Sequence, residues 1–390
     1  MSAPDAGAVI NNNEETTDLM GSRNEESVDT LAFEPERLRL ARELKEWSQA
    51  DLATRLDVTP AAVSQFETGV TRPGTDALDR MTSALGVPAQ FFSLPLTETH
   101  DGFFRSLRRT SVTHRRRARA LAHIAHDLAV TAGAPGLYPV LVPQIPVSGL
   151  QAPRDEIEDA ARQARQAFGM PAGPVPNVAE VLEQHGILVI RLPLDTADVD
   201  AFSLPFHDRP VVVLGTDKND RARSRFDGAH ELGHLVIHDD QIWGVKEVEH
   251  QAHVFAAAFL MPADDIRDEL PERADWPVLF ELKQKWQVSL AALLMRARTL
   301  GRMSENNYLT AVKAASARGW RRVEPVPLGR PEHPACLSRL LATSAGRQSL
   351  EFLPHDVVEA LVTATTAVER HGNVSRNVTK CQWSASAGSR

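Results

Sequence analysis

The chain has 390 residues, enough for two or three domains at roughly 100–200 residues each. Its apolar share of 43% is ordinary for a globular protein, and no apolar run approaches the roughly 20 residues that a membrane-spanning helix needs. Only two cysteines occur, Cys336 and Cys381, so we expect neither a disulfide framework nor a cysteine zinc site. The N-terminus lacks a signal-peptide pattern. These features predict a cytoplasmic protein without a membrane partner.

The net charge of −8 is unevenly distributed along the chain. Residues 1–34 contain eight acidic residues against Arg23 alone, and they are polar and poor in aromatic residues. Because such a segment cannot bury enough apolar surface to fold, we expect a disordered acidic tail over 1–34. The rest of the chain is close to neutral, so local charge must decide whether it binds nucleic acid.

Residues 35–95 predict a compact all-α unit, because apolar residues recur there at helical spacing. Ser48 and Thr59 are favourable N-cap residues, and Pro60 suits the first position of a helix. From Ser48 to Gly69 the pattern predicts a helix, a turn and a second helix. Their shared core is expected to contain Leu52, Ala53, Val58, Val63 and Phe66.

The second helix of this pair is suited to the major groove of DNA, with its N-terminal residues on the base edges. Gln65 can read adenine, and Ala61 or Ala62 can contact a thymine methyl group. Gln49 opens the first helix, where a phosphate contact is natural. The predicted DNA-binding residues are Gln49, Thr59, Ala61, Ala62, Ser64, Gln65 and Arg72.

This segment resembles the Cro/repressor helix-turn-helix family of the XRE type. The positions that carry the resemblance are Gln49, Leu52-Ala53, Val63-Ser64 and Glu67-x-Gly69. The resemblance implies a double-stranded DNA operator as partner and a homodimer, because such readers usually bind paired half-sites. The alternative is a helical protein-binding module, which is favoured by the seven Arg and Lys against eight Asp and Glu within 35–95.

Residues 96–154 predict a basic helix followed by a Pro-rich linker. The stretch 103–119 has seven arginines and no acidic residue, and 132–155 is rich in Pro and Gly. A solvated charged helix and a contact with DNA phosphates are both open for the basic stretch, and a phosphate contact would weaken steeply with salt. The arginines are Arg105, Arg108, Arg109, Arg115, Arg116, Arg117 and Arg119.

Residues 155–320 alternate between helical and strand patterns, and 321–390 stay unassigned. Short β-branched runs at 187–192 and 210–214 predict strands of a small sheet. We expect the second of these strands to align an extended substrate by β-augmentation. A weaker helix-turn-helix pattern at 281–303 has an apolar second helix, which favours packing over DNA contact. Helices are expected at 155–170, 177–185, 222–238 and 247–261, and again within 275–320.

The helix predicted over 222–238 contains His230-Glu231-Leu232-Gly233-His234. Residues four apart share one face of a helix, so His230 and His234 can bind a single ion, and Glu231 can reach the water on that ion. A surface helix with two incidental histidines is the alternative. The apolar surroundings disfavour it, since polar groups in a buried helix are costly unless they are paired or liganded.

A catalytic zinc takes three protein ligands and one open position, so a third ligand must come from elsewhere. His238 lies about 6 Å further along the helix axis and is better interpreted as a helix-end histidine near the last carbonyl groups. Glu249 is the better candidate, because it lies one turn before Ala252 on the packing face of the next helix. Glu247 is its rival, displaced by two positions and predicted to face away.

The whole arrangement over about 155–300 resembles the ImmA/IrrE family of zinc metallopeptidases. The resemblance implies Zn held by His230, His234 and Glu249, with Glu231 as the water-activating base, and hydrolysis of a partner repressor. His253 stands where the family commonly has Asn, so it either changes a contact behind the ligands or serves as a substrate or oxyanion donor. The resemblance is carried by Arg223-Ser224-Arg225-Phe226, by 229–238, by Glu249-x-x-Ala252, by Ala201-Phe202-Ser203 and by the sequence from Phe255 to Pro262.

The predicted fold is multi-domain, an all-α helix-turn-helix domain followed by an α+β zincin-like domain with a helical extension over 155–320. The predicted function is a DNA-binding transcriptional regulator with a zinc metallo-endopeptidase domain that hydrolyses a peptide bond in a partner regulator. Two alternatives remain. The peptidase-like domain only senses a ligand or metal, which an intact Glu231 disfavours, or the chain is an antitoxin-like regulator whose zincin-like domain binds a toxin.

Overall fold

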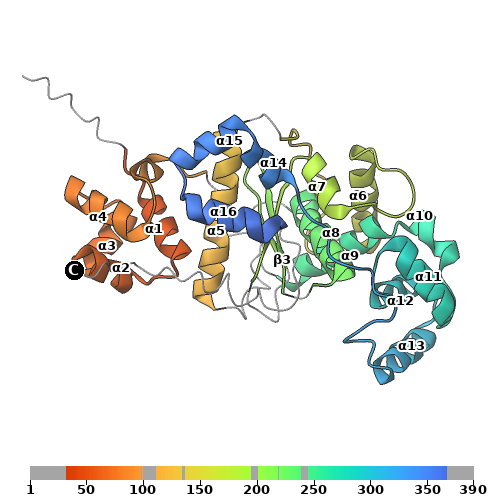
Figure 1. Cartoon of the computed structure of the whole chain (residues 1–390). Coiled ribbons are helices and arrows are strands. Elements are labelled where there is room, and N and C mark those ends of the chain that lie inside the picture. Colours follow the sequence, from red (N-terminus) through yellow and green to blue (C-terminus); the bar gives the residue numbers. More distant parts are fainter. Residues whose placement is uncertain are drawn as a thin grey trace, which may run out of the picture.

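Figure 1 shows a computed structural model that describes residues 32–97, 99, 111–133, 137–194, 201–217, 219–238 and 245–366. Residues 1–31 of the predicted acidic tail lie outside this part of the chain, as do Arg105, Arg108 and Arg109 of the basic stretch. None of the described helices is long and apolar enough to cross a membrane.

The N-terminal helices form the unit at one end of the molecule (Figure 1). The side chain of Ser48 accepts a hydrogen bond from the Asp51 N–H, and Thr59 accepts one from the Ala62 N–H, so both predicted N-caps are confirmed. Pro60 occupies the first turn of the second helix, also as predicted. The elements are α1 (Pro35–Leu44), α2 (Gln49–Leu56), α3 (Pro60–Glu67), α4 (Thr75–Leu85) and the 3-10 helix η1 (Ala89–Ser93).

Helix α5 (Val112–Ala132) connects this unit to the rest of the molecule. Its apolar residues share one continuous core with α1, α2 and η1 and with one face of the sheet. At the junction, the Arg37 guanidinium donates to both carboxylate oxygens of Asp127, and both side chains are buried. The predicted basic helix is therefore only basic in its first turns and is buried further along.

Within the described residues the sheet has three strands, β1 (Leu188–Leu192), β2 (Ala201–Leu204) and β3 (Val211–Gly215), in the order β1-β3-β2. Strand β3 pairs with β1 in parallel and with β2 antiparallel. Alternate residues of β1, such as Val189 and Ile190, belong to different cores, so both faces of the sheet are buried. Because β3 is central and paired on both sides, its predicted role as a substrate-aligning edge is wrong.

Helices from the middle of the chain cover one face of the sheet and extend from it. They share a second core, which includes the apolar residues of the weak helix-turn-helix pattern at 281–303, so packing is confirmed there. The elements are α6 (Arg154–Ala167), α7 (Val178–Gln184), α8 (Arg221–Ile237), α9 (Lys246–Leu260), α10 (Ala263–Ile266), η3 (Arg267–Glu269), α11 (Trp276–Trp286), α12 (Leu290–Thr299) and α13 (Glu305–Ala317).

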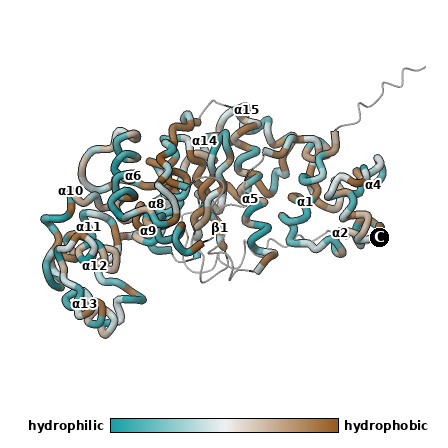
Figure 2. Tube along the Cα trace, turned by 180° about the vertical axis from the view of Figure 1, so that it is seen from behind, coloured by the Kyte–Doolittle hydropathy of each residue, from teal (hydrophilic) through white to brown (hydrophobic). Residues whose placement is uncertain are grey.

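The segment after residue 330, which the sequence left unassigned, covers the other face of the sheet together with α5. Its apolar residues Leu337, Leu340 and Val358 join the core that the N-terminal unit shares. Figure 2 shows the hydrophobic segments gathered around β1, α5 and α14, between more polar ends. The elements are α14 (Cys336–Ala342), α15 (Ser344–Gln348), η4 (Ser349–Glu351) and α16 (His355–Thr366).

The Pro-rich stretch after α5 runs along the end of α8. The Ile145 N–H donates to the Val236 carbonyl at 2.8 Å, and Gln144 Nε2 donates to the Leu235 carbonyl at 3.0 Å. Ile145 also packs against the second core. The segment that the sequence predicts as a linker is thus attached to the helix that contains the histidine pair, while the domain boundaries stay a prediction.

Candidate functional site

Helices α8 and α9 bring the candidate ligands together. Asp220 caps the start of α8 by accepting from the Arg223 N–H. The two helices are in close contact at Gly233, where a Cβ would lie 3.0 Å from the ring of Phe255. This absence of a side chain lets α9 pack directly over the histidine pair and places Glu249 opposite it.

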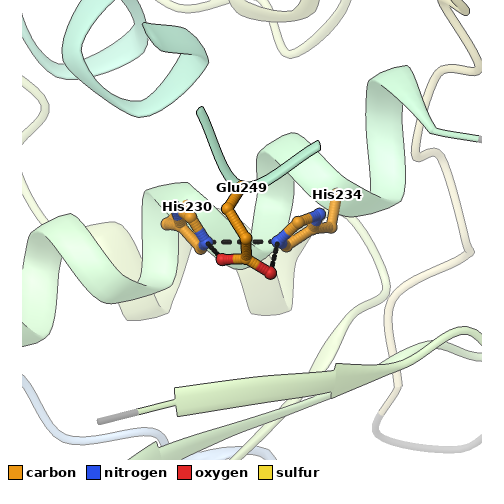
Figure 3. A group of neighbouring side chains, drawn as sticks. All are labelled: His230, His234 and Glu249. Carbon is orange, nitrogen blue, oxygen red and sulfur yellow. Dashed lines mark hydrogen bonds and ion pairs between the residues drawn. The ribbon is translucent and has the colours of Figure 1, made fainter. Parts of the chain in front are cut away.

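His230, His234 and Glu249 form the group of metal-competent side chains found among the described residues, and their donor atoms all lie within 4.8 Å of one another (Figure 3). The Nε2 atoms of the two histidines are 3.1 Å apart. Glu249 Oε2 is 3.4 Å from His230 Nε2, and Glu249 Oε1 is 3.9 Å from His234 Nε2. Glu247, the rival, is not part of this group.

These distances fit a metal ion. Zinc–ligand bonds of about 2.0–2.1 Å in a tetrahedron place neighbouring donor atoms about 3.3 Å apart, close to the separations of these three side chains. Glu249 Oε1 is buried and accepts no hydrogen bond within the described structure. Burial, together with the neighbouring histidines, lowers the pKa of His234 well below its usual value, so its imidazole is held in the neutral form that binds metals.

Glu231 lies beside this group and faces the sheet. The Ser203 hydroxyl, on β2, donates to Glu231 Oε2 at 2.7 Å. Burial raises the pKa of the Glu231 carboxyl well above its usual range, and the hydrogen bond from Ser203 opposes this rise. One oxygen of the carboxylate is thereby fixed in place by a neutral donor.

A cleft of about 1130 Å³ opens over these residues and is lined by His230, Glu231 and Glu249. Its apolar wall comes from α9 and α12, with Val254, Ala292 and Met295 among its residues. Its rim carries charged side chains of both signs. They are Arg154, Asp220, Arg223, Asp227, Lys246, Arg321, Arg322 and Glu324.

His253 also lines the cleft, and its ring lies 4.6 Å from that of His230. Its Nδ1 is 2.9 Å from the Glu249 carbonyl, which can only accept, so Nδ1 carries the proton. In the neutral ring Nε2 is then an acceptor, and partial desolvation together with the nearby His230 lowers the pKa of His253. An oxyanion donor role would require the imidazolium form, which these surroundings disfavour.

His238 ends α8, as predicted, and is not part of the candidate ligand group. Its side chain lies close to two neighbouring polar side chains. Nδ1 lies 3.0 Å from His234 Nδ1, and Nε2 lies 3.0 Å from Gln251 Oε1.

The predicted DNA-binding residues lie on α2, on α3 and just beyond it. Thr59, Ala61, Gln65 and Arg72 are exposed, whereas Gln49 is half-buried. Gln49 Nε2 donates to Glu67 Oε2 at 2.8 Å, and this carboxylate also accepts from Arg42. These hydrogen bonds therefore link the N-terminal start of α2 to α1 and α3. Ala62 and Ser64 are half-buried.

Two arginines of the basic stretch lie near acidic residues of the N-terminal unit. Arg116 Nε is 3.7 Å from Glu43, and Arg117 Nε is 3.9 Å from Glu46. They offset part of the acidic charge that weakens the case for DNA binding by 35–95. Their salt-sensitive contact with phosphates stays a prediction.

Reasoning from the sequence assigned no role to Ser203 beside Glu231, to Gln251 or to Gly149. A signal for Ser203 exists, because a hydroxyl in an otherwise apolar short strand needs a buried partner. The contact between Gln251 and Gly149 carries no local sequence signal, since the two residues are 102 positions apart.

Two family models match the chain. A helix-turn-helix model matches residues 38–92, and a model described as the IrrE N-terminal-like domain matches residues 182–298, which include all of α8 and α9. No curated protein matches. The chain thus carries an XRE-type helix-turn-helix followed by a peptidase-like domain, and the predicted fold class, helical unit first and α+β zincin-like domain second, is confirmed.

Proposed function

We propose that this chain is a DNA-binding regulator whose peptidase-like domain is a zinc endopeptidase. The observation that carries the proposal is the tetrahedral spacing of His230, His234 and Glu249 beside a buried carboxylate and a cleft. His230, His234 and Glu249 would hold the ion, leaving one position for water. A bound zinc would polarise the scissile carbonyl and lower the pKa of its bound water.

Glu231 is the residue that moves the proton in this proposal. It lies one position from His230 and lines the cleft, where it can take a proton from the attacking water and return it to the leaving amine. Ser203 holds Glu231 Oε2 at 2.7 Å, which keeps the carboxylate from rotating away.

Strand β2 is the edge strand on the cleft side of the sheet. It pairs only with β3 within the sheet order, and Ala201 at its start lines the cleft. An extended substrate segment can align along β2 by β-augmentation, in place of the central β3. A Pro at Ala201 is expected to slow cleavage without changing zinc binding.

The cleft favours an apolar side chain flanked by acidic residues. Two acidic side chains of the rim are already engaged, since Asp220 caps α8 and Glu324 Oε2 accepts from Lys283 at 2.7 Å. Lys246, Arg321 and Arg322 are exposed on the same rim. An acidic regulator segment with an apolar anchor therefore matches both the wall and the rim.

The test is cleavage of a peptide library by the zinc-loaded full chain, compared with Glu231→Gln. We expect wild type to cut at sites that combine an apolar with an acidic residue, and Glu231→Gln to bind zinc as well as wild type does but to lose cleavage. Equal cleavage by both proteins, or cleavage by neither, would reject the enzyme.

Metal sensing is the second candidate function, and one observation favours it. The core that contains α1 and α2 continues without a break to β2, the strand that carries Ser203. Occupancy of the zinc site can then alter DNA binding through packed residues. DNA affinity that changes between zinc-loaded and zinc-free Glu231→Gln would support sensing independently of hydrolysis.

A further inference from the structure

A chain of four polar groups runs from the Pro-rich segment to the candidate zinc site. Gln251 Nε2 donates to the Gly149 carbonyl at 2.7 Å. Gln251 Oε1 lies 3.0 Å from His238 Nε2, and His238 Nδ1 lies 3.0 Å from His234 Nδ1. Gln251 is 3% exposed and His234 is 1% exposed, so water competes little for these contacts.

The donor and the acceptor of each hydrogen bond in this chain follow from the contact between Gln251 and Gly149. A carbonyl oxygen only accepts, so Gly149 fixes the Gln251 amide with its NH₂ group toward Gly149 and its oxygen toward His238. That oxygen only accepts, so His238 Nε2 carries a proton. In the neutral ring His238 Nδ1 is then an acceptor, and the proton between the two Nδ1 atoms belongs to His234.

A proton on His234 Nδ1 leaves the lone pair on His234 Nε2. This is the atom that lies 3.1 Å from His230 Nε2 and 3.9 Å from Glu249 Oε1, at the position where an ion would bind. The two histidines differ in this respect. Among the described residues His230 Nδ1 is buried without a hydrogen-bond partner, so no such chain is seen for His230.

We propose that His238 and Gln251 are positioning residues that hold His234 in the tautomer able to bind zinc, with the Gly149 carbonyl as the fixed end of the chain. The proposal rests on the proposed zinc site. Outer partners of metal-binding histidines fix the ring tautomer, and they typically increase metal affinity by about 10–100-fold. The Pro-rich segment thereby becomes part of the metal centre.

The backbone around Gly149 is built to present this carbonyl. Gly149 has φ +120°, a conformation that other residues rarely adopt, and its neighbour Ser148 is held by the Glu156 carboxylate through both its N–H and its hydroxyl. Earlier in the segment, Gln144 and Ile145 bind carbonyl groups at the end of α8. The segment is therefore anchored to α8 before Gly149 and to α6 next to it, while Gly149 itself contacts α9.

Zinc affinity of full-length variants, measured by chelator competition, tests the proposal. Gln251→Leu keeps the side-chain volume but cannot accept a hydrogen bond from His238. We therefore expect zinc to bind about 10–100-fold more weakly, as is typical when such a partner is lost. Gln251→Glu still accepts from His238 Nε2 but cannot donate to the Gly149 carbonyl, so it is expected to recover part of the affinity. Gln166→Leu, the same change at an exposed position of α6, is the matched control.

A second readout needs no metal. Nitrogen-15 NMR of histidine side chains in the zinc-free protein, with His234 assigned by a His234→Asn variant, reports which ring nitrogen carries the proton. We expect the proton on Nδ1 in wild type and Gln251→Glu, and a mixture of tautomers in Gln251→Leu.

Equal zinc affinity of Gln251→Leu and wild type, or a wild-type proton on His234 Nε2, would overturn the proposal. Failure of wild type to bind zinc at all would instead refute the proposed function, while the tautomer measurement still decides whether the chain of bonds exists.

Discussion

At the scale of single residues, the candidate metal centre depends on one carboxylate chosen from two on the same helix. Glu247 and Glu249 both lie in the first turn of α9, but only Glu249 belongs to the group with the two histidines. The side chain of Glu249 is 25% exposed, so it closes the group on the side of the cleft. A comparison of Glu247 with Glu249 therefore separates a role in metal binding from a general effect of negative charge.

Glu249→Gln is expected to weaken zinc binding by more than about 100-fold, beyond the range typical of outer partners, because it removes a direct anionic ligand. Glu247→Gln removes the same charge two positions away and is expected to change zinc affinity less than about threefold, since Glu247 lies outside the ligand group and its charge is partly screened by solvent. Chelator competition measures both. Similar losses in the two variants would contradict the ligand assignment.

The exposed residues around α3 differ in what they can contact on DNA. Gln65→Ala is expected to cost about 1–3 kcal/mol on the preferred site and little on other sequences, because a base contact carries specificity. Arg72→Ala is expected to weaken binding to all sequences and to lower the salt slope by about 0.9 if it contacts one phosphate. Fluorescence anisotropy across a salt series, on a site selected from random DNA, distinguishes the two. Identical behaviour of the two variants would count against this assignment.

At the scale of elements, α5 decides how the molecule is assembled. Its first turns are basic, and its later turns are buried between the N-terminal unit and the sheet. His126 stacks on Phe206 at 3.9 Å and binds Asp208 at 2.7 Å, while His123 meets the same ring edge-on. His123 Nε2 is buried and has no hydrogen-bond partner in the part of the chain that the structure describes.

His123 makes the stability of this element sensitive to acid. Burial, with Arg119, Arg37 and His126 nearby, lowers the pKa of His123 well below its usual value. The unfolded chain therefore takes up a proton that the folded protein does not. The free energy of unfolding should be level above the unfolded pKa and fall below it by up to about 1.4 kcal/mol per pH unit.

Denaturant unfolding of His123→Leu between pH 5 and pH 8, an interval that spans about one unit or more on either side of an ordinary histidine pKa, tests this. The variant is expected to lose part of the acid dependence, whereas His207→Leu, at an exposed position, is expected to keep it. An unchanged acid slope in His123→Leu would refute the assignment.

At the scale of the whole molecule, the DNA-reading unit and the sheet share a core. The residues that connect them lie on α1, α5, α14 and α16, which come from both ends of the chain. The ion pair of Arg37 with Asp127 lies at this junction, and Arg37 also donates to the carbonyl groups of Leu94 and Pro95. We therefore expect the two parts to unfold together.

Asp127→Asn leaves a buried guanidinium without its charged partner, at a cost on the order of 3–5 kcal/mol. Hydrogen exchange should show faster opening in both α2 and β1, and calorimetry should show one transition at a lower temperature. Wild-type protection in α2 together with opening of β1 would show that the two parts are independent.

The sequence by itself determined the local features of this protein. The caps at Ser48 and Thr59, the helices of the two motifs and the buried strands follow from residue type and periodicity, because these act over a few neighbouring positions. The spacing of His230 and His234 likewise predicts two ligands on one helix face. Helical periodicity also favours Glu249, because it places this residue on the packing face of the next helix.

Only the tertiary structure decided how these features meet. The order of strands made β3 central and β2 the edge, and the last helices covered a face of the sheet that no local pattern assigns to them. The contact of Ser203 with Glu231, and the chain from Gly149 through Gln251 to His234, join residues far apart along the chain. Such contacts depend on packing and on the satisfaction of buried polar groups, which arise only when the elements have been brought together.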